Sequence, residues 1–372
     1  MSRNVSKLII LTVMLAGLPL VGLISTGYNP HDYLEFPPKT LYVKHAPFSL
    51  PVFFGLGLPT LLILLPFICR AGLFITATSN AAVIKRERSF PWWGYVGLLA
   101  GGLSWILAWT RFTWFNCLQL HTFVPLWLSY ILVMSALTNR RKGSCLMTRQ
   151  PRTFFSLFLV STAFWWFFEY LNRFVQNWYY VEVSRFSSLE YFMLASASFS
   201  TVLPAVLGTR EYLLTFSFFD KAFGSYIRLN PKSARSLALV LLIISGFGLA
   251  CVGILPNYLF PLLWISPLVI IVSLQTMMNE NHMLSDLRKG RWTMIVASAV
   301  SALICGFFWE MWNYFSMAKW VYSVPYVQKF HLFEMPLLGY AGYLPFGLEC
   351  AVIGDMICRF DKNGGKNEEV SC

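Results

Sequence analysis

The sequence predicts an all-α protein: a polytopic membrane helix bundle of about ten transmembrane helices, with two tandem four-helix repeats. Three observations support this prediction. Of the 372 residues, 56% are hydrophobic and only 12% are charged, whereas soluble domains carry roughly 25% charged residues. Apolar runs of roughly 20 residues, the length that crosses a bilayer core, recur along the chain. An acidic and aromatic segment occurs twice at a nearly constant separation, which is typical of an internal repeat.

The predicted transmembrane segments follow one another through short polar connections. The chain begins with Arg3 and Lys7 and continues into a long apolar run. A cleaved signal peptide normally has only about 7–15 apolar residues, so we favour a retained first helix. Prolines in the polar stretch that follows exclude a continuous helix there. The ten predicted spans are residues 8–26, 49–69, 92–110, 118–138, 153–172, 189–208, 236–255, 258–278, 293–315 and 335–357.

The basic residues predict the orientation. With both termini inside, the inner segments hold roughly three times as many of the 29 lysines and arginines as the outer segments. Lys85, Arg86 and Arg88, for example, then lie inside. The net charge of +12 therefore marks one membrane face and does not indicate a nucleic-acid partner. We predict a multi-pass protein of the inner cell membrane with both termini in the cytoplasm.

The eight cysteines contain no C-x-x-C pair, and most of them lie within or beside apolar segments. This distribution predicts neither a disulfide framework nor a zinc site. No other motif indicates a bound group, so we predict no metal and no cofactor.

The segments at 164–181 and 306–324 indicate a duplication. Glu310 follows Glu169 by 141 residues, and Asn313 follows Asn172 by the same 141 residues. Acids are rare in membrane-spanning segments, so their matched spacing is a stronger indication than the aromatic matches. Further pairs at similar separations are Trp178 and Trp320, Tyr180 and Tyr322, Glu190 and Glu334, and Pro204 and Pro345.

The duplication divides the chain into four parts. Residues 1–91 hold two transmembrane helices and an outer proline-rich loop, and residues 92–234 hold the first four-helix repeat with a cytoplasmic basic loop. Residues 235–358 form the second repeat, and residues 359–372 form a cytoplasmic tail. Because both repeats run in the same direction, we expect a pseudo-two-fold axis along the membrane normal, as in some transporters.

The glutamates of these segments require an explanation, because an acid inside a membrane is costly. A structural explanation exists for most of them. Glu169 can pair with Arg173 one turn away, and Glu190 and Glu334 can cap helix N-termini, where negative charge is favoured. Tryptophan and tyrosine also form interfacial belts without any chemistry. Glu349 is predicted to lie deeper, without a basic residue nearby in sequence, and there a functional role is favoured.

The functional interpretation is acid–base chemistry in an aromatic pocket. A desolvated carboxylic acid can keep its proton near neutrality and act as a general acid. Aromatic faces stabilise a developing cation, so a lipid or isoprenoid double bond dissolved in the membrane is a suitable substrate. The predicted catalytic residues are Glu310, Glu349, Glu334 and Asn313. The predicted substrate-binding residues are Trp320, Tyr322, Trp312, Glu169, Asn172, Trp178 and Tyr180.

One stretch resembles a known family. The W-x-Y-x-x-P run at Trp320, Tyr322 and Pro325, followed by Leu344-Pro345 and Glu349, is similar to the integral-membrane lycopene cyclases of carotenoid synthesis. That resemblance implies redox-neutral, acid-catalysed chemistry on an isoprenoid, with Glu349 in the place of the acid. The sequence departs from the family pattern, because a single glutamate follows Pro345 by four residues where the family carries adjacent glutamates closer to its proline.

Three alternatives remain open at this point. His331 and Glu334 form an H-x-x-E spacing that suits a metal or haem site on the outer side if the segment is helical. Acids near the centre of a repeated bundle also suit a proton-coupled carrier or a channel. The acids can instead pair helices in a purely structural protein. The sequence indicates no oligomeric state.

Overall fold

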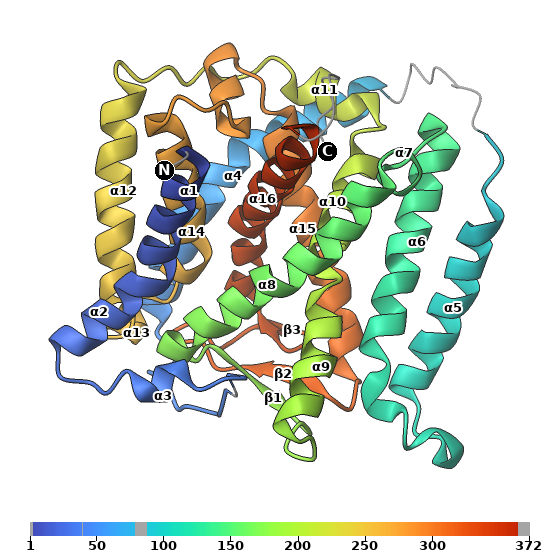
Figure 1. The fold of residues 1–372 in the computed structure, drawn as a ribbon. Coiled ribbons are helices and arrows are strands. Elements are labelled where there is room, and N and C mark those ends of the chain that lie inside the picture. The colour runs from blue at the N-terminus through green and yellow to red at the C-terminus, as the bar shows by residue number, and fades with distance from the viewer. Residues whose placement is uncertain (1–2, 39, 79–87, 364–372) are drawn as a thin grey trace.

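The computed structural model describes residues 3–38, 40–78 and 88–363 and shows an all-α membrane helix bundle (Figure 1). Lys39, Lys85, Arg86 and Lys366, which enter the predicted charge distribution, lie outside the described residues. Within the described part, eight helical segments are long and apolar enough to cross a membrane, which confirms a multi-pass protein. They are Lys7–Ser25, Leu50–Ile75, Gln119–Lys142, Pro151–Val175, Ser188–Leu213, Ala234–Cys251, Thr293–Tyr314 and Leu337–Arg359.

The two other predicted spans are occupied by α5 (Trp92–Trp109) and by the shorter apolar helix α14 (Leu262–Met277). The remaining long helices lie close to their predicted positions. They are α1 (Arg3–Thr12) and α2 (Leu18–Ser25), joined by the π-helix η1 (Val13–Gly17), α4 (Leu50–Thr78), α6 (Phe123–Lys142), α8 (Pro151–Val175), α9 (Ser188–Phe199), α10 (Val202–Leu213), α12 (Ala234–Cys251), α15 (Thr293–Tyr314) and α16 (Tyr343–Asn363).

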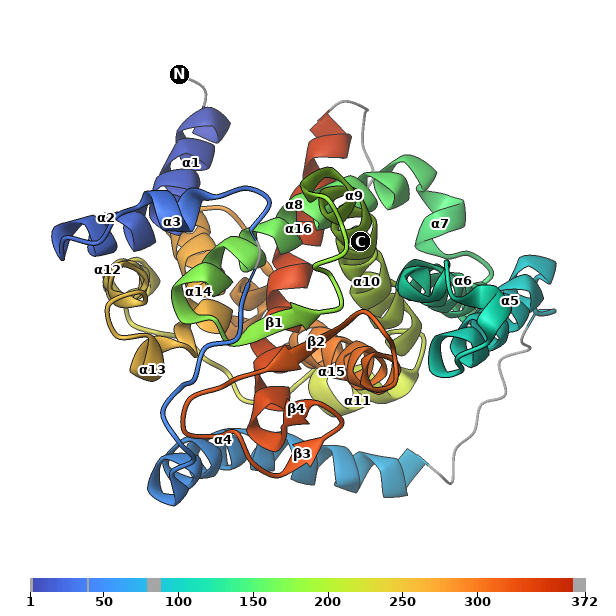
Figure 2. The same ribbon diagram turned by 90° about the horizontal axis from the view of Figure 1, so that it is seen from below.

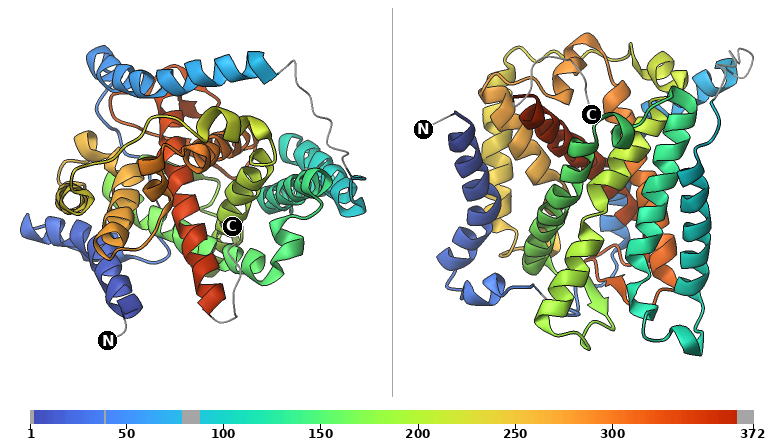
Figure 3. Two further views of the ribbon diagram at one scale, coloured as in Figure 1. Left: turned by 90° about the horizontal axis from the view of Figure 1, so that it is seen from above. Right: turned by 45° about the vertical axis from the view of Figure 1, so that its right-hand side comes forward.

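The helices of the two expected repeats pack with the same pattern of neighbours. Helix α5 packs on α6 as α12 packs on α14, and α6 packs on α10 as α14 packs on α16. Across the centre, α10 contacts α15 as α16 contacts α8. Viewed along the bundle, α5 and α6 lie at one side and α12 and α14 at the opposite side (Figure 3). These are the pairings expected of two related units about a central axis.

Sequence signals account for several helix ends. Helix α6 ends at Lys142 and is capped by Gly143, whose φ of 85° gives the left-handed conformation for which glycine is suited. Arg140, Arg141 and Lys142 occupy its last turn, where the helix dipole favours positive charge. Helix α9 begins with a capping box between Ser187 and Glu190, which confirms the predicted capping role of Glu190.

Two predicted spans differ from the structure. The span at 189–208 is divided into α9 and α10, which are separated by Ser200 and Thr201. The span at 335–357 becomes regular α-helix only at Tyr343, because β4 and a 3-10 turn precede it. The short elements are α3 (His31–Leu34), α7 (Leu146–Arg149), α11 (Ser217–Phe223), α13 (Pro256–Leu259), η2 (Thr113–Phe115), η3 (Gln119–His121), η4 (Met283–Lys289) and η5 (Leu337–Gly342).

The structure also contains two small antiparallel strand pairs that the sequence analysis did not predict. Strand β1 (Trp178–Val181) pairs with β2 (Lys319–Tyr322), and β3 (His331–Leu332) pairs with β4 (Met335–Pro336). These strands lie at the end of the bundle opposite the two chain termini (Figure 1). We call these two ends the strand end and the terminus end.

The proline-rich segment before α4 crosses the strand end (Figure 2). His45 hydrogen-bonds the Asn257 side chain and the Gln176 carbonyl, each at 3.1 Å. The Ser323 hydroxyl donates to the Val43 carbonyl at 2.7 Å. This segment therefore ties the two expected repeats together at the strand end, while α4 lies along one side of the bundle.

Candidate functional site

The candidate site lies against the antiparallel pair of strands β1 and β2. Their register pairs Trp178 with Tyr322 and Tyr180 with Trp320. Alternate residues of a strand point to the same face, so all four rings lie on one side of the ribbon. Trp178 matches Trp320 in the duplication, and Tyr180 matches Tyr322. The register is therefore unchanged when the two units are exchanged, as at a two-fold interface.

Two buried asparagines position the strands. The Asn172 Oδ1 accepts the Asn177 amide at 2.8 Å, and its Nδ2 donates to the Trp178 carbonyl at 2.8 Å. The Asn313 Oδ1 accepts the Trp320 amide at 3.0 Å, and its Nδ2 donates to the Trp320 carbonyl at 2.8 Å. Each carboxamide bonds backbone groups through both its oxygen and its nitrogen, and neither asparagine lines the cavity, so in this structure both side chains hold the strands.

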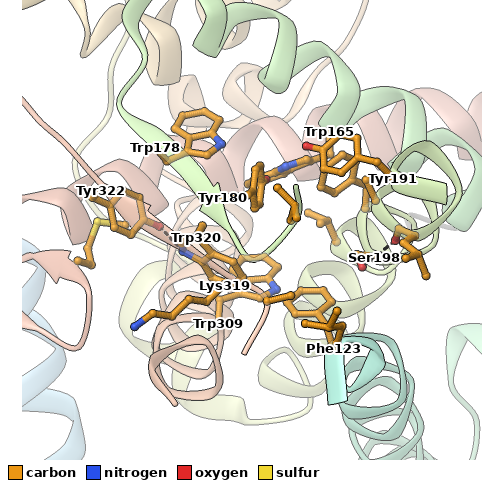
Figure 4. Close-up of a pocket in the computed structure, with 18 of the residues that line it drawn as sticks. Phe123, Trp165, Trp178, Tyr180, Tyr191, Ser198, Trp309, Lys319, Trp320 and Tyr322 are labelled. Atoms are coloured by element: carbon orange, nitrogen blue, oxygen red, sulfur yellow. Dashed lines mark hydrogen bonds between the residues drawn. The ribbon is translucent and has the colours of Figure 1, made fainter. Parts of the chain in front are cut away.

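An aromatic cavity of about 160 Å³ lies against these strands (Figure 4). Its wall comes from both expected repeats, so the two acidic and aromatic segments converge on a single cavity. The lining consists of Leu120, Phe123, Trp165, Trp178, Tyr180, Val183, Phe186, Tyr191, Leu194, Ala195, Ser198, Phe199, Val202, Trp264, Trp309, Ala318, Lys319, Trp320, Tyr322, Met335, Gly339, Gly342 and Tyr343.

Glu169 lies directly behind this wall. Its Oε1 accepts three hydrogen bonds from lining residues: from Trp165 Nε1 at 3.0 Å, Trp178 Nε1 at 3.1 Å and the Tyr180 hydroxyl at 2.5 Å. The carboxyl group is completely buried. The expected pairing with Arg173 does not form, because Arg173 reaches Glu35 of the N-terminal segment at 3.7 Å.

Glu310 occupies the matching position behind the other half of the wall. Its Oε1 accepts the Tyr322 and Tyr343 hydroxyls, each at 2.7 Å. The Trp320 Nε1 donates to the Tyr322 hydroxyl at 2.9 Å, which extends the network along the cavity. Glu310 is completely buried as well. Each half of the cavity thus has one acid that contacts it through aromatic hydroxyl or indole groups.

The second carboxyl oxygen of each glutamate, Oε2, has no hydrogen-bond partner among the described residues. Burial, reinforced by the neighbouring glutamates, raises the pKa of the Tyr180 and Tyr322 phenols well above their ordinary value. Both phenols therefore remain protonated and can donate to the carboxyl oxygens at any physiological pH.

Three of the predicted site residues lie elsewhere. Glu349 is buried on α16, and its side chain does not line the cavity. Glu334 lies in the turn between β3 and β4, outside the lining, and forms an ion pair with Lys319 of the cavity wall. The expectation that Glu334 opens the following helix is therefore wrong. Trp312 packs against Trp105 and Trp127, on the side of α15 that faces α5 and α6.

Several wall residues were missing from the sequence prediction. Trp165 precedes Glu169 by four residues, a spacing that places both on one helix face and that could have identified it. Tyr343 and Trp264 carry no comparable signal, because they reach the cavity only through the packing of α16 and α14. Aromatic residues are too frequent in this chain for their type alone to mark a site.

The structure gives no support for a metal site in its described part, where no group of three or more metal-ligating side chains occurs. His331 lies in β3, so the predicted helical spacing with Glu334 is wrong. The His331 ring instead contacts the Gln328 amide at 3.2 Å.

Comparison of the chain with protein-family models, with curated proteins and with solved structures finds no match.

Proposed function

We propose that this chain is an integral membrane enzyme that carries out acid–base chemistry on the double bonds of an apolar, membrane-dissolved substrate of the isoprenoid class. One observation supports this proposal above all others. Two buried carboxyl groups, Glu169 and Glu310, contact one aromatic cavity from opposite repeats through the hydrogen bonds of its wall.

The cavity suits a carbocation intermediate. Trp178, Trp320 and Trp309 belong to a wall that is mainly aromatic and aliphatic. Its one charged side chain, Lys319, is neutralised by the ion pair with Glu334. Tryptophan faces attract a positive charge most strongly when water is excluded, by about 2 kcal/mol or more. The same wall keeps water away from the cation, so that it can lose a proton before it is hydrolysed.

The volume of the cavity limits what enters it. A cavity of about 150 Å³ accommodates benzene, and the cavity here measures about 160 Å³. One six-membered ring or the end of an isoprenoid chain fits such a space, whereas a whole long polyene does not. The rest of a long substrate would remain in the bilayer.

The proton moves through the tyrosines. Each phenol donates to its glutamate in the structure, so its hydrogen must turn from the carboxyl oxygen to the substrate. The protonated glutamate then gives its proton to the phenol oxygen as the phenol hydrogen transfers to an alkene carbon. The carbocation loses a proton from a neighbouring carbon through the second phenol to the second glutamate, and exchange with water reprotonates the first glutamate and deprotonates the second before the next turnover. The proton that is added and the proton that is removed balance, so the reaction needs no oxidant or reductant.

Deuterium incorporation tests this function without requiring that the product be known. The purified protein is reconstituted in D₂O in liposomes that contain lycopene, squalene or geranylgeraniol, and the lipids are analysed by mass spectrometry. Protonation of a double bond leaves a carbon-bound deuteron. We expect incorporation with the wild-type chain and a loss of roughly 100-fold or more with Glu310→Gln and with Glu169→Gln.

Glu182→Gln is the matched control, because Glu182 forms only an exposed pair with Arg185 at 2.5 Å. That variant should incorporate deuterium at the wild-type rate. Unchanged incorporation in both Glu310→Gln and Glu169→Gln would refute the proposal. Movement of an unaltered lipid between leaflets, without incorporation, would refute it in favour of a carrier.

A further inference from the structure

The two halves of the cavity wall offer different hydrogen-bonding groups to their buried glutamates. The Glu169 Oε1 accepts two indole N–H groups, from Trp165 at 3.0 Å and from Trp178 at 3.1 Å, besides its phenol partner. Within the described part of the chain, the Glu310 Oε1 accepts hydroxyl groups alone. The direct indole contacts are therefore a feature of the first half.

Two positions of the duplication account for this difference. Trp165 corresponds to Gly306, at the same separation of 141 residues that relates the two glutamates. A Cβ atom on Gly306 would overlap the Tyr343 ring, so the glycine makes room for this ring. The first-half counterpart of Tyr343 is Val202, which has no hydroxyl group. An indole donor in the first half is thus replaced by a phenol in the second.

The matched tryptophans of the two strands also donate to different groups. The Trp178 Nε1 donates directly to the carboxyl group of its half at 3.1 Å. The Trp320 Nε1 donates instead to the Tyr322 hydroxyl at 2.9 Å (Figure 4). Both positions at which the halves differ therefore bring an indole N–H group to Glu169 and a hydroxyl group to Glu310.

These groups favour opposite protonation states of the two glutamates. An indole N–H group can only donate a hydrogen bond, whereas a phenol can either donate or accept one. Hydrogen bonds to an ionised acceptor are roughly twice as strong as those to a neutral one. Two indole donors on one oxygen therefore favour Glu169 as a carboxylate. The Tyr343 hydroxyl can instead accept the proton of a neutral Glu310.

The ionisable side chains near the two glutamates are mostly phenols. Near Glu169 they are Tyr180 of β1 and Tyr191 of α9. Near Glu310 they are Tyr322 of β2, Tyr340 of η5, Tyr343 of α16 and Glu334. The negative charge of Glu334 opposes a second negative charge on Glu310, although the ion pair with Lys319 weakens this effect. Local charge thus agrees with a neutral Glu310.

We propose that Glu310 is the proton donor and Glu169 the proton acceptor of the proposed reaction, on which this inference rests, and that Trp165 and Trp178 are positioning residues that hold Glu169 ionised. The donated proton passes through the phenols of the second half to one carbon of the double bond. The released proton passes from the neighbouring carbon through Tyr180 to Glu169. One C–H bond forms and one breaks, so the reaction needs no oxidant or reductant.

This assignment also orients the substrate. The carbon that gains a proton faces the second half of the wall, and the carbon that loses one faces the first half. After each turnover Glu310 is ionised and Glu169 is protonated, and exchange with water restores both.

Infrared spectroscopy of the carboxyl groups tests the assignment and requires no substrate. The protein is placed in lipid nanodiscs, and the carboxylic C=O band of each glutamate is identified by its absence from Glu169→Gln or from Glu310→Gln. We expect Glu169 to bind its proton roughly tenfold or more weakly than Glu310, so that the Glu169 band disappears first as the pH is raised.

Trp165→Phe and Trp178→Phe each remove one indole donor and keep an aromatic ring in the wall. Each should strengthen proton binding by Glu169 roughly tenfold and leave the Glu310 band unchanged. Trp320→Phe is the matched control, because the Trp320 N–H group donates to a phenol. In that variant the Glu169 band should disappear at the same pH as in the wild-type chain.

Disappearance of the two bands together, or of the Glu310 band first, would overturn the assignment. A Glu169 band that is unchanged in both Trp165→Phe and Trp178→Phe would overturn it as well, as would the lack of any carboxylic band assignable to Glu310. The order of the bands can hold while deuterium incorporation fails, and it can be reversed while incorporation succeeds. The two proposals are therefore judged separately.

Discussion

Replacing Asn172 with leucine tests whether the paired asparagines hold the strands that form the cavity wall. The Asn172 side chain is completely buried. It bonds the Asn177 amide at 2.8 Å, the Trp178 carbonyl at 2.8 Å and the Trp178 amide at 3.4 Å. Leucine has a similar volume, so the substitution removes the hydrogen bonds without opening a large cavity.

The magnitude follows from the backbone groups that lose their partners. A buried backbone group without a hydrogen bond costs about 1–3 kcal/mol. The two contacts at 2.8 Å are strong, and the contact at 3.4 Å is near the limit of a useful hydrogen bond. We therefore expect Asn172→Leu to lower the free energy of unfolding by about 3 kcal/mol. Asn313→Leu, which removes two contacts, should cost about 2 kcal/mol.

Reversible unfolding in mixed detergent micelles, followed by circular dichroism, measures these differences. Asn116→Leu is the matched control, since Asn116 is exposed and only its backbone forms hydrogen bonds in the structure. Its free energy of unfolding should change by less than about 0.5 kcal/mol. If Asn172→Leu were as stable as this control, the carboxamide would not be what holds β1. The double variant should cost less than the sum of the single variants, because β1 and β2 are paired.

Three further predictions concern the site, a helix cap and pH. Tyr180→Phe and Tyr322→Phe should each lower deuterium incorporation by roughly 100-fold while the circular dichroism spectrum stays unchanged; a rate equal to wild type would exclude the phenol relay. Ser187→Ala should lower the free energy of unfolding by about 1 kcal/mol, because it removes half of the capping box with Glu190; an unchanged unfolding midpoint would contradict this. Burial lowers the pKa of His282, so the unfolded state binds a proton first as pH falls below about 6.5. Stability should therefore decline on acidification through that range, and His282→Gln should remove this part of the decline in a pH series of unfolding midpoints.

The membrane class and the approximate positions of the spans were determined by the sequence alone. A bilayer imposes a minimum length of apolar residues, and that requirement is local, so runs such as 293–315 identify their helices directly. The capping role of Glu190 was equally local, because Ser187 lies three residues before it. The buried positions of Glu169 and Glu310 also agree with their place in apolar sequence.

The strands and the single cavity were decided by tertiary structure. Trp178 and Trp320 lie in short connections whose local sequence predicts interfacial loops. The two connections form strands only because each provides the hydrogen-bonding partner of the other. A two-residue or four-residue strand has no stability without such pairing, so no local pattern can predict it.

The roles of the acids depended on the same long-range contacts. The sequence places Glu310 and Glu349 near one another along the chain's last two helices, but the direction of each side chain depends on which helix it packs against. Packing brings Tyr343 to Glu310 and leaves Glu349 buried in the bundle, outside the cavity wall. Helix periodicity determines which residues share a face, whereas only the fold determines what that face contacts.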